Sequence, residues 1–238
     1  MKVFVSPHFD DAIGSSGCLI HSLVAAAEEV QILTIFAGEH DGNISEFARK
    51  MLSIWHLRNG VTERALENAE ACSILGTKDL NFLFIEALYR KDIDWLYPFD
   101  GDLFGPIKSF DMNLPRKIAD EIANNFGKET VFFFPGGRGK HVDHLLVKQA
   151  GEILYSKGFR VWFYTDFSYT GEINKGFKMR KIVKKFNMID LNVKIRAFNA
   201  YKSQLQMLFK SDDASEYFFK ENLSKEGEVY EEYYEIIG

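Results

Sequence analysis

Short apolar runs recur along this chain, spaced so that a helix fits between one run and the next. These runs predict buried strands over residues 1–6, 30–36, 81–85, 130–134 and 159–164. Helical periodicity predicts helices over residues 11–27, 44–56, 62–76, 114–126 and 141–156. Strands that are apolar on both faces are typical of parallel sheets covered on both sides. The alternation therefore predicts an α/β fold: an open, mostly parallel, Rossmann-like sheet with helices on both faces.

The pattern becomes less regular after residue 170. We expect a helix over 175–186 and interpret its basic run, Lys175 to Lys185, as a solvated helix face. The segment 187–196 is ambiguous, and a further strand is one interpretation of it. A helix over 197–209 and an edge strand over 227–237 complete the prediction.

Length and composition narrow the class of protein. The 238 residues show no repeat or linker, which favours a single domain over 1–238. A net charge of −5 gives no indication of nucleic-acid binding. No run approaches the roughly 18 apolar residues of a membrane span, so we expect no integral membrane segment. Two cysteines without a CxxC motif are typical of a reduced, cytoplasmic compartment, and the composition leaves a homo-oligomer open.

One segment has no regular period. Residues 87–110 contain the aromatic residues Trp95, Tyr97, Phe99 and Phe104 between short charged stretches. A long irregular insert in a compact domain is usually functional or mobile. It can be interpreted as a cap or lid beside a site, or as an ordinary surface excursion.

Two motifs concentrate ligand-type side chains. The first, residues 6–11 (SPHFDD), directly follows the first predicted strand. The second, residues 141–144 (HVDH), follows the fourth strand after a glycine-rich turn. In open α/β sheets, ligands bind outside the carboxyl ends of the strands, so both motifs are predicted at one edge of the sheet. Taken singly, the aspartates could be ordinary helix caps and the histidines surface residues; together they favour a shared metal ion.

The residue types suit a catalytic metal. Zinc in such sites takes about three protein ligands and keeps a position for water. His8, one of Asp10 and Asp11, and one histidine of the second motif can supply the three ligands. The other aspartate remains as a general base and the other histidine as an acid or oxyanion stabiliser, with Asp143 placed to orient an imidazole. Iron, cobalt and manganese also accept such a ligand set.

The motifs resemble those of a known family. Residues 7–12 (PHFDDA) resemble the PHxDD signature of the PIG-L/LmbE-like zinc-dependent N-deacetylases, and Gly137 with residues 141–144 resembles their second motif. Further segments similar to the family are residues 34–38, 64–67, 164–169 and 200–204. The similarity extends from residue 3 to about residue 204.

The resemblance implies a role for each site residue. His8, Asp11 and His144 would be the zinc ligands, Asp10 the general base, His141 (in its protonated form) an oxyanion stabiliser that Asp143 tunes, and Arg64 a substrate contact. The implied reaction is hydrolysis of an N-acetyl group on a small-molecule amino sugar or glycoconjugate: a glycan, a glycolipid or a natural-product precursor.

Two alternatives remain at this point. One is a related amidase that removes a larger acyl group, with the aromatic residues of the insert lining its pocket. The other is a non-catalytic sugar-binding protein with the same fold.

Overall fold

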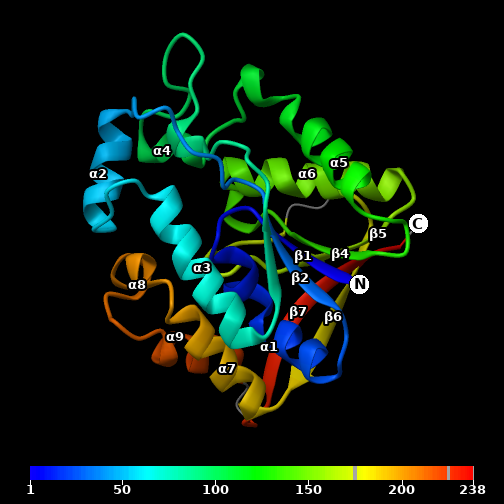
Figure 1. Cartoon of the computed structure of the whole chain (residues 1–238). Coiled ribbons are helices and arrows are strands. Elements are labelled where there is room, and N and C mark those ends of the chain that lie inside the picture. The colour runs from blue at the N-terminus through cyan, green and yellow to red at the C-terminus, as the bar shows by residue number, and fades with distance from the viewer. Residues whose placement is uncertain (174–175, 224–225, 238) are drawn as a thin grey trace.

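The computed structural model describes residues 1–173, 176–223 and 226–237. The described residues form a seven-stranded sheet in the order β3-β2-β1-β4-β5-β7-β6 (Figure 1). Its strands are β1 (Lys2–Ser6), β2 (Val30–Thr34), β3 (Lys78–Asn81), β4 (Val131–Pro135), β5 (Arg160–Tyr164), β6 (Met179–Phe186) and β7 (Val229–Ile236). The first five strands in the spatial order are parallel, and β7 runs antiparallel to both of its neighbours. The predicted open, mostly parallel α/β sheet is confirmed.

Helices cover both faces of the sheet. The helices of the described residues are α1 (Asp11–Ala25), α2 (Glu46–Ile54), α3 (Val61–Leu75), α4 (Asp100–Leu103), α5 (Leu114–Asn125), α6 (Val142–Ser156), α7 (Met188–Phe198), α8 (Lys202–Phe209) and α9 (Ser215–Asn222). Helices α5 and α6 pack together on one face, and α1, α3 and α7 pack on the other (Figure 1). This two-sided cover is the arrangement that the apolar strands predicted.

The alternation of side chains along β1 explains the two layers. Val3 and Val5 point into the core formed with α5 and α6, whereas Phe4 points into the core formed with α1, α3 and α7. Phe4 stacks on Phe133 of β4 with ring centroids 4.5 Å apart. The side chains of Val3, Phe4 and Val5 are fully buried, and each contributes about 1.5–3 kcal/mol of hydrophobic stabilisation. The central strands are therefore held on both faces.

Two predicted elements are wrong in position or type. The third strand covers Lys78–Asn81 rather than 81–85, because the chain leaves the sheet after Asn81: Phe82 is buried but Leu83 is 76% exposed. The segment predicted as a helix over 175–186 forms strand β6 from Met179; Lys175 itself lies outside the described residues. The basic side chains of β6 lie against acidic residues of β7, such as Lys181 against Glu232 at 2.6 Å.

The C-terminal third differs from the prediction in three further respects. Residues 187–196 hold no strand, because Asn187 caps helix α7 by accepting a hydrogen bond from the Asp190 backbone. The helix predicted over 197–209 is two helices, with α7 ending at Phe198 and α8 beginning at Lys202. Strand β7 exists as predicted, but it lies between β5 and β6, so that β6 forms the edge.

The insert contains only short elements. These are single turns at Ala87–Tyr89 and Ser109–Asp111 and the four-residue helix α4. None of the helices within the described ranges has the length and apolar character to span a bilayer.

Candidate metal centre

Three strand ends bring the candidate residues together. Strands β1, β4 and β5 are neighbours in the sheet and run parallel. His8 and Asp11 follow β1, His144 follows β4, and Asp166 follows β5. The predicted convergence at one edge therefore occurs, since the first and fourth strands along the chain pair directly.

The capping interpretation of the first motif does not hold. Asp10 occupies the N-cap position of α1, yet its side chain makes no cap hydrogen bond. The backbone N–H of Ala12 instead donates to Ser6 Oγ at 2.9 Å. The Asp11 carboxylate accepts a hydrogen bond from the His8 backbone at 2.8 Å. Both aspartate side chains are thus directed at the site, and Ser6 supplies the local cap.

His8, Asp11 and His144 converge on one point. Asp11 Oδ2 lies 3.2 Å from His8 Nδ1 and 3.3 Å from His144 Nε2. One ligand atom from each residue lies within 4.8 Å of the other two, and all three side chains are buried. This is the donor set, two imidazoles and a carboxylate, that a catalytic zinc site uses.

A second carboxylate anchors each imidazole from behind. His8 Nε2 hydrogen-bonds to Asp143 Oδ2 at 3.0 Å, and His144 Nδ1 to Asp166 Oδ1 at 2.6 Å. The nitrogens that face Asp11 are therefore the ones left for a ligand. His144 Nε2 is buried and makes no hydrogen bond within the described part of the chain. A carboxylate behind each histidine is the usual outer layer of metal sites, so the residues fit a metal ion.

The charges around the centre also suit a cation. Burial by itself lowers the pKa of His144, but Asp11 and Asp166 raise it to about 9. Burial by itself raises the pKa of Asp11, but His144 and His8 bring it well below its ordinary value. The cluster thus favours positive charge at its centre, which a divalent ion supplies in exchange for protons.

A second trio, His8, His141 and Asp143, also brings one possible ligand atom from each residue within 4.8 Å of the other two. It fits a metal less well, because these nitrogen and oxygen atoms already have partners in the protein. Asp143 accepts from the Ala87 backbone at 2.9 Å and pairs with Arg90 at 2.6 Å. His141 Nδ1 accepts from the Asp143 backbone at 3.2 Å.

Asp10 lies beside the centre and contacts a buried arginine. Arg64 Nη2 is 3.3 Å from Asp10 Oδ1, and Arg64 Nη1 is 3.3 Å from Glu86 Oε2. The guanidinium stacks over the Trp55 ring at 5.1 Å. Burial and the neighbouring Asp11 raise the pKa of Asp10, while Arg64 opposes the rise. Asp10 is therefore a carboxylate of raised basicity whose ionised form Arg64 stabilises.

His141 lies beside both candidate ligand histidines, with its ring centroid 5.2 Å from that of His8 and 5.5 Å from that of His144. Burial, together with the charges of His8 and His144, lowers its pKa to about 3. This lowered pKa favours a neutral imidazole, whereas the resemblance implied a protonated one. Since Nδ1 accepts the Asp143 backbone N–H, the ring proton lies on Nε2. The neutral ring can still donate one hydrogen bond.

These residues line a cavity of about 260 Å³. Its polar lining includes His8, Asp10, Asp11, Arg64 and His141. An apolar part of its wall is formed by Met51, Trp55, Leu88, Leu103, Phe104 and Met207. Leu103 and Phe104 belong to the irregular insert, and the Phe104 ring lies 5.4 Å from that of His141. The insert therefore forms part of the cavity wall.

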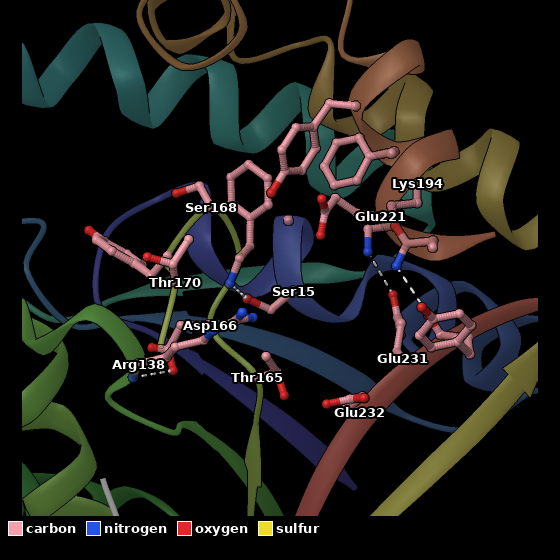
Figure 2. A pocket seen from close by; sticks show the side chains of 17 residues that line it. Ser15, Arg138, Thr165, Asp166, Ser168, Thr170, Lys194, Glu221, Glu231 and Glu232 are labelled. Atoms are coloured by element: carbon pink, nitrogen blue, oxygen red, sulfur yellow. Dashed lines mark hydrogen bonds and ion pairs between the residues drawn. The ribbon is translucent and has the colours of Figure 1, made fainter. Parts of the chain in front are cut away.

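The sequence interpretation gave no role to Asp166, Glu86 or Arg90. Asp166 is held from both sides: Oδ1 by His144 and Oδ2 by the Arg138 backbone N–H at 3.0 Å. Figure 2 shows the hydrogen bond between Arg138 and Asp166 in a view of a neighbouring cavity. That cavity has a volume of about 430 Å³, and Asp166 is one of its lining residues. A carboxylate at the end of β5, on the same edge as the two motifs, was the available signal for Asp166.

Comparisons with known proteins identify the family. The family model described as "PIG-L: GlcNAc-PI de-N-acetylase" matches residues 3–155. A 2'-N-acetylparomamine deacetylase from Niallia circulans is 31% identical over 228 residues, covering 87% of this chain and 82% of that protein.

Solved structures share the fold. A teicoplanin deacetylase in a zinc-inhibited form matches with a TM-score of 0.84 and 23% identity, covering 99% of this chain and 97% of that one. An N,N'-diacetylchitobiose deacetylase from Pyrococcus horikoshii matches with a TM-score of 0.57 and 15% identity, covering 99% and 83%. At these identities the structures establish the fold alone. The family model and the curated relative establish more: this chain belongs to the PIG-L family of de-N-acetylases, as the sequence motifs predicted.

Proposed function

We propose that this protein is a metal-dependent hydrolase that removes an N-acetyl group from an amino-sugar-containing small molecule. The observation that carries the proposal is the convergence of two carboxylate-anchored imidazoles on Asp11, with Asp10 beside them. Family membership supports the reaction, and the similarity to a 2'-N-acetylparomamine deacetylase supports an amino-sugar substrate.

His8, Asp11 and His144 would hold the metal. When bound, a divalent ion there would polarise the acetamide carbonyl and lower the pKa of a nearby water molecule. Zinc fits the donor set, and iron, cobalt or manganese would fit it too. Because a teicoplanin deacetylase of the same fold is described in a zinc-inhibited form, assays of this protein use one equivalent of metal rather than an excess.

The remaining residues would manage protons and charge. Asp10 takes a proton from the attacking water, and its raised pKa helps it to pass that proton to the leaving amine. His141 donates a hydrogen bond from Nε2 to the oxyanion that develops on the carbonyl oxygen. Arg64 keeps Asp10 ionised before attack and lines the cavity where the sugar would bind. Acetate and a free amine result.

One alternative has a structural observation in its favour. The apolar wall formed by Met51, Leu103, Phe104 and Met207 could take a longer acyl chain than acetyl, as an amidase for larger acyl groups requires. A non-catalytic sugar-binding protein is not favoured, because Asp10 and His141, the proposed base and oxyanion donor, line one cavity together with His8 and Asp11 of the proposed ligand set.

Acetate release tests the proposal. Purified protein with one equivalent of metal is assayed on N-acetylated amino sugars and on the same amines carrying longer acyl groups. We expect Asp10→Asn to lower the rate about 10²–10⁴-fold with metal content unchanged, since it removes the general base. Asp120→Asn, at an exposed aspartate paired with Lys157, is the control and should be fully active. Full activity of Asp10→Asn would contradict the assignment, and faster cleavage of the longer acyl groups would favour the amidase.

A further inference from the structure

Arg90 lies between two fully buried carboxylates. Its Nε is 2.9 Å from Asp111 Oδ2, and its Nη1 is 2.6 Å from Asp143 Oδ1. Nη1 also donates to the Ile85 backbone carbonyl at 3.0 Å. Asp111 and Asp143 have no exposed surface, and Arg90 is 6% exposed. One guanidinium thus serves two charges that have no access to water.

The contact with Asp111 joins the two ends of the insert. Arg90 and Asp111 stand at the two ends of the segment 91–110 that carries Leu103 and Phe104 to the cavity wall. Tyr97, inside that segment, donates its hydroxyl to Asp111 at 2.8 Å, and its ring lies 5.3 Å from the Arg90 guanidinium. The two ends and the middle of the insert therefore meet at one ion pair.

The contact with Asp143 leads to the metal centre. Asp143 Oδ2 accepts hydrogen bonds from His8 Nε2 at 3.0 Å and from the Ala87 backbone at 2.9 Å. Burial by itself raises the pKa of Asp143, but Arg90 and His8 bring it well below its ordinary value. Asp143 is therefore a fixed carboxylate whose position depends on Arg90 on one side and sets His8 on the other.

We propose that Arg90 is a positioning residue: fixed by Asp111, it holds the Asp143 carboxylate against His8 Nε2 and so builds the insert into the metal centre. The proposal rests on the proposed metal site for its effect on function. Its geometric content is independent of the metal. It follows that loosening the far end of the insert at Asp111 is felt at the His8 imidazole.

Arginine suits this role better than lysine. Its planar guanidinium carries three nitrogens on one rigid group, so that Nε and Nη1 can lie at ion-pair distance from separate carboxylates at once. A lysine ammonium is a compact charge on a flexible stem. It can neutralise Asp143 or Asp111, but it has a single nitrogen and cannot place separate atoms against both.

The experiment measures metal affinity in three variants, by competition with a chelator of known affinity. Arg90→Met should weaken binding about 10–100-fold, the range seen when partners of metal ligands are removed. Arg90→Lys should recover part of the loss, and Asp111→Asn should cause a smaller loss. In the cobalt-substituted protein, the visible absorption bands should shift for Arg90→Met as the His8 ligand moves.

The control is a second buried ion pair, Lys194 with Glu231, at 2.9 Å and 1% exposed on each side. Lys194→Met removes a comparable buried charge outside the metal centre. It should lower the melting temperature and leave metal affinity and the cobalt spectrum unchanged. Equal losses of affinity in Lys194→Met and Arg90→Met would overturn the proposal, because a general loosening of the fold would then explain both.

A readout without metal separates this proposal from the proposed function. The imidazole ¹⁵N signals of His8, assigned by their loss in His8→Gln, report its bond to Asp143 in the metal-free protein. They should shift in Asp111→Asn and remain in place in Lys194→Met. If Arg90→Met does not fold, the His8 signals of Asp111→Asn alone test the positioning role. Unchanged His8 signals would refute the positioning role, whereas a wild-type protein that binds no metal would refute the proposed function alone.

Discussion

Two clusters of buried charge in this protein differ in one respect. In the first, Glu231 of β7 accepts from Lys194 and the Cys18 backbone on one oxygen, and from the Leu19 backbone and Tyr233 on the other. Every oxygen has two donors, and the cluster ties β7 to α1 and α7. Such a saturated set contributes to folding and leaves no atom for a ligand.

The metal centre is equally buried but not saturated. His8 and His144 are each bound on one ring nitrogen, while the other nitrogen faces Asp11. Both clusters place carboxylates against cations at similar depth. The comparison shows that burial and charge alone do not distinguish a metal site from a structural ion pair. What distinguishes the metal centre is that ring nitrogens of His8 and His144 face its interior without a strong hydrogen-bond partner.

The largest expected effect comes from removing an inward-facing ligand. In His144→Ala, acetate release should fall to the rate without enzyme, because a ligand is lost along with the imidazole that pairs with Asp11. Treating the wild-type protein with a chelator should have the same result, and adding back one equivalent of zinc should restore only the wild type. Circular dichroism checks that the variant is folded. Substantial activity in folded His144→Ala would break the distinction between the clusters.

An intermediate effect is expected from the anchoring layer. Asp166→Asn keeps the shape of the side chain but removes the charge behind His144 Nδ1. We expect metal affinity to fall about 10–100-fold. Calorimetric titration of the metal-free protein measures the change. Unaltered affinity would mean that the carboxylate behind the imidazole is a packing feature.

A substitution in the saturated cluster should have the smallest effect on metal binding. It should also have the largest effect on the free energy of unfolding. Glu231→Gln leaves Lys194 buried without its counter-charge, which costs about 3–5 kcal/mol of unfolding free energy. Urea denaturation gives this value, and metal affinity measured below the transition should equal that of the wild type. A variant that keeps its stability and loses metal would reverse the roles of the two clusters.

Local patterns predicted the central part of the fold well. Strands β1, β2, β4 and β5 are apolar on both faces, and that character is visible in any short window of sequence. Strand β6 was mistaken for a helix because its stability depends on β7, some fifty residues later. Lys181 and Lys185 face Glu232 and Glu228 across that pairing, so the charges read as a solvated helix are cross-strand pairs.

The site divides in the same way. Two motifs that follow strands, the second after a glycine-rich turn, predicted which side chains meet, since parallel strands bring their carboxyl ends to one edge. The hydrogen-bond partner of each side-chain atom depends on the direction of the side chain. The spacing of residues in the sequence does not determine that direction. Asp143 was expected to serve His141, yet its carboxylate bonds to His8. Arg90 and Asp166 contact partners that lie 21 to 53 positions away in the chain, and the sequence alone does not pair them.

The open edge of the sheet has a consequence for how copies of this protein meet. Strand β6 ends the strand order, and its outer backbone groups face no other strand within the described residues. An exposed edge of this kind is a template for intermolecular sheet growth. Four basic side chains, Arg180, Lys181, Lys184 and Lys185, occupy it. A second copy approaching this edge would have to strip water from these charged side chains, so the charged strand protects the protein against edge-to-edge aggregation.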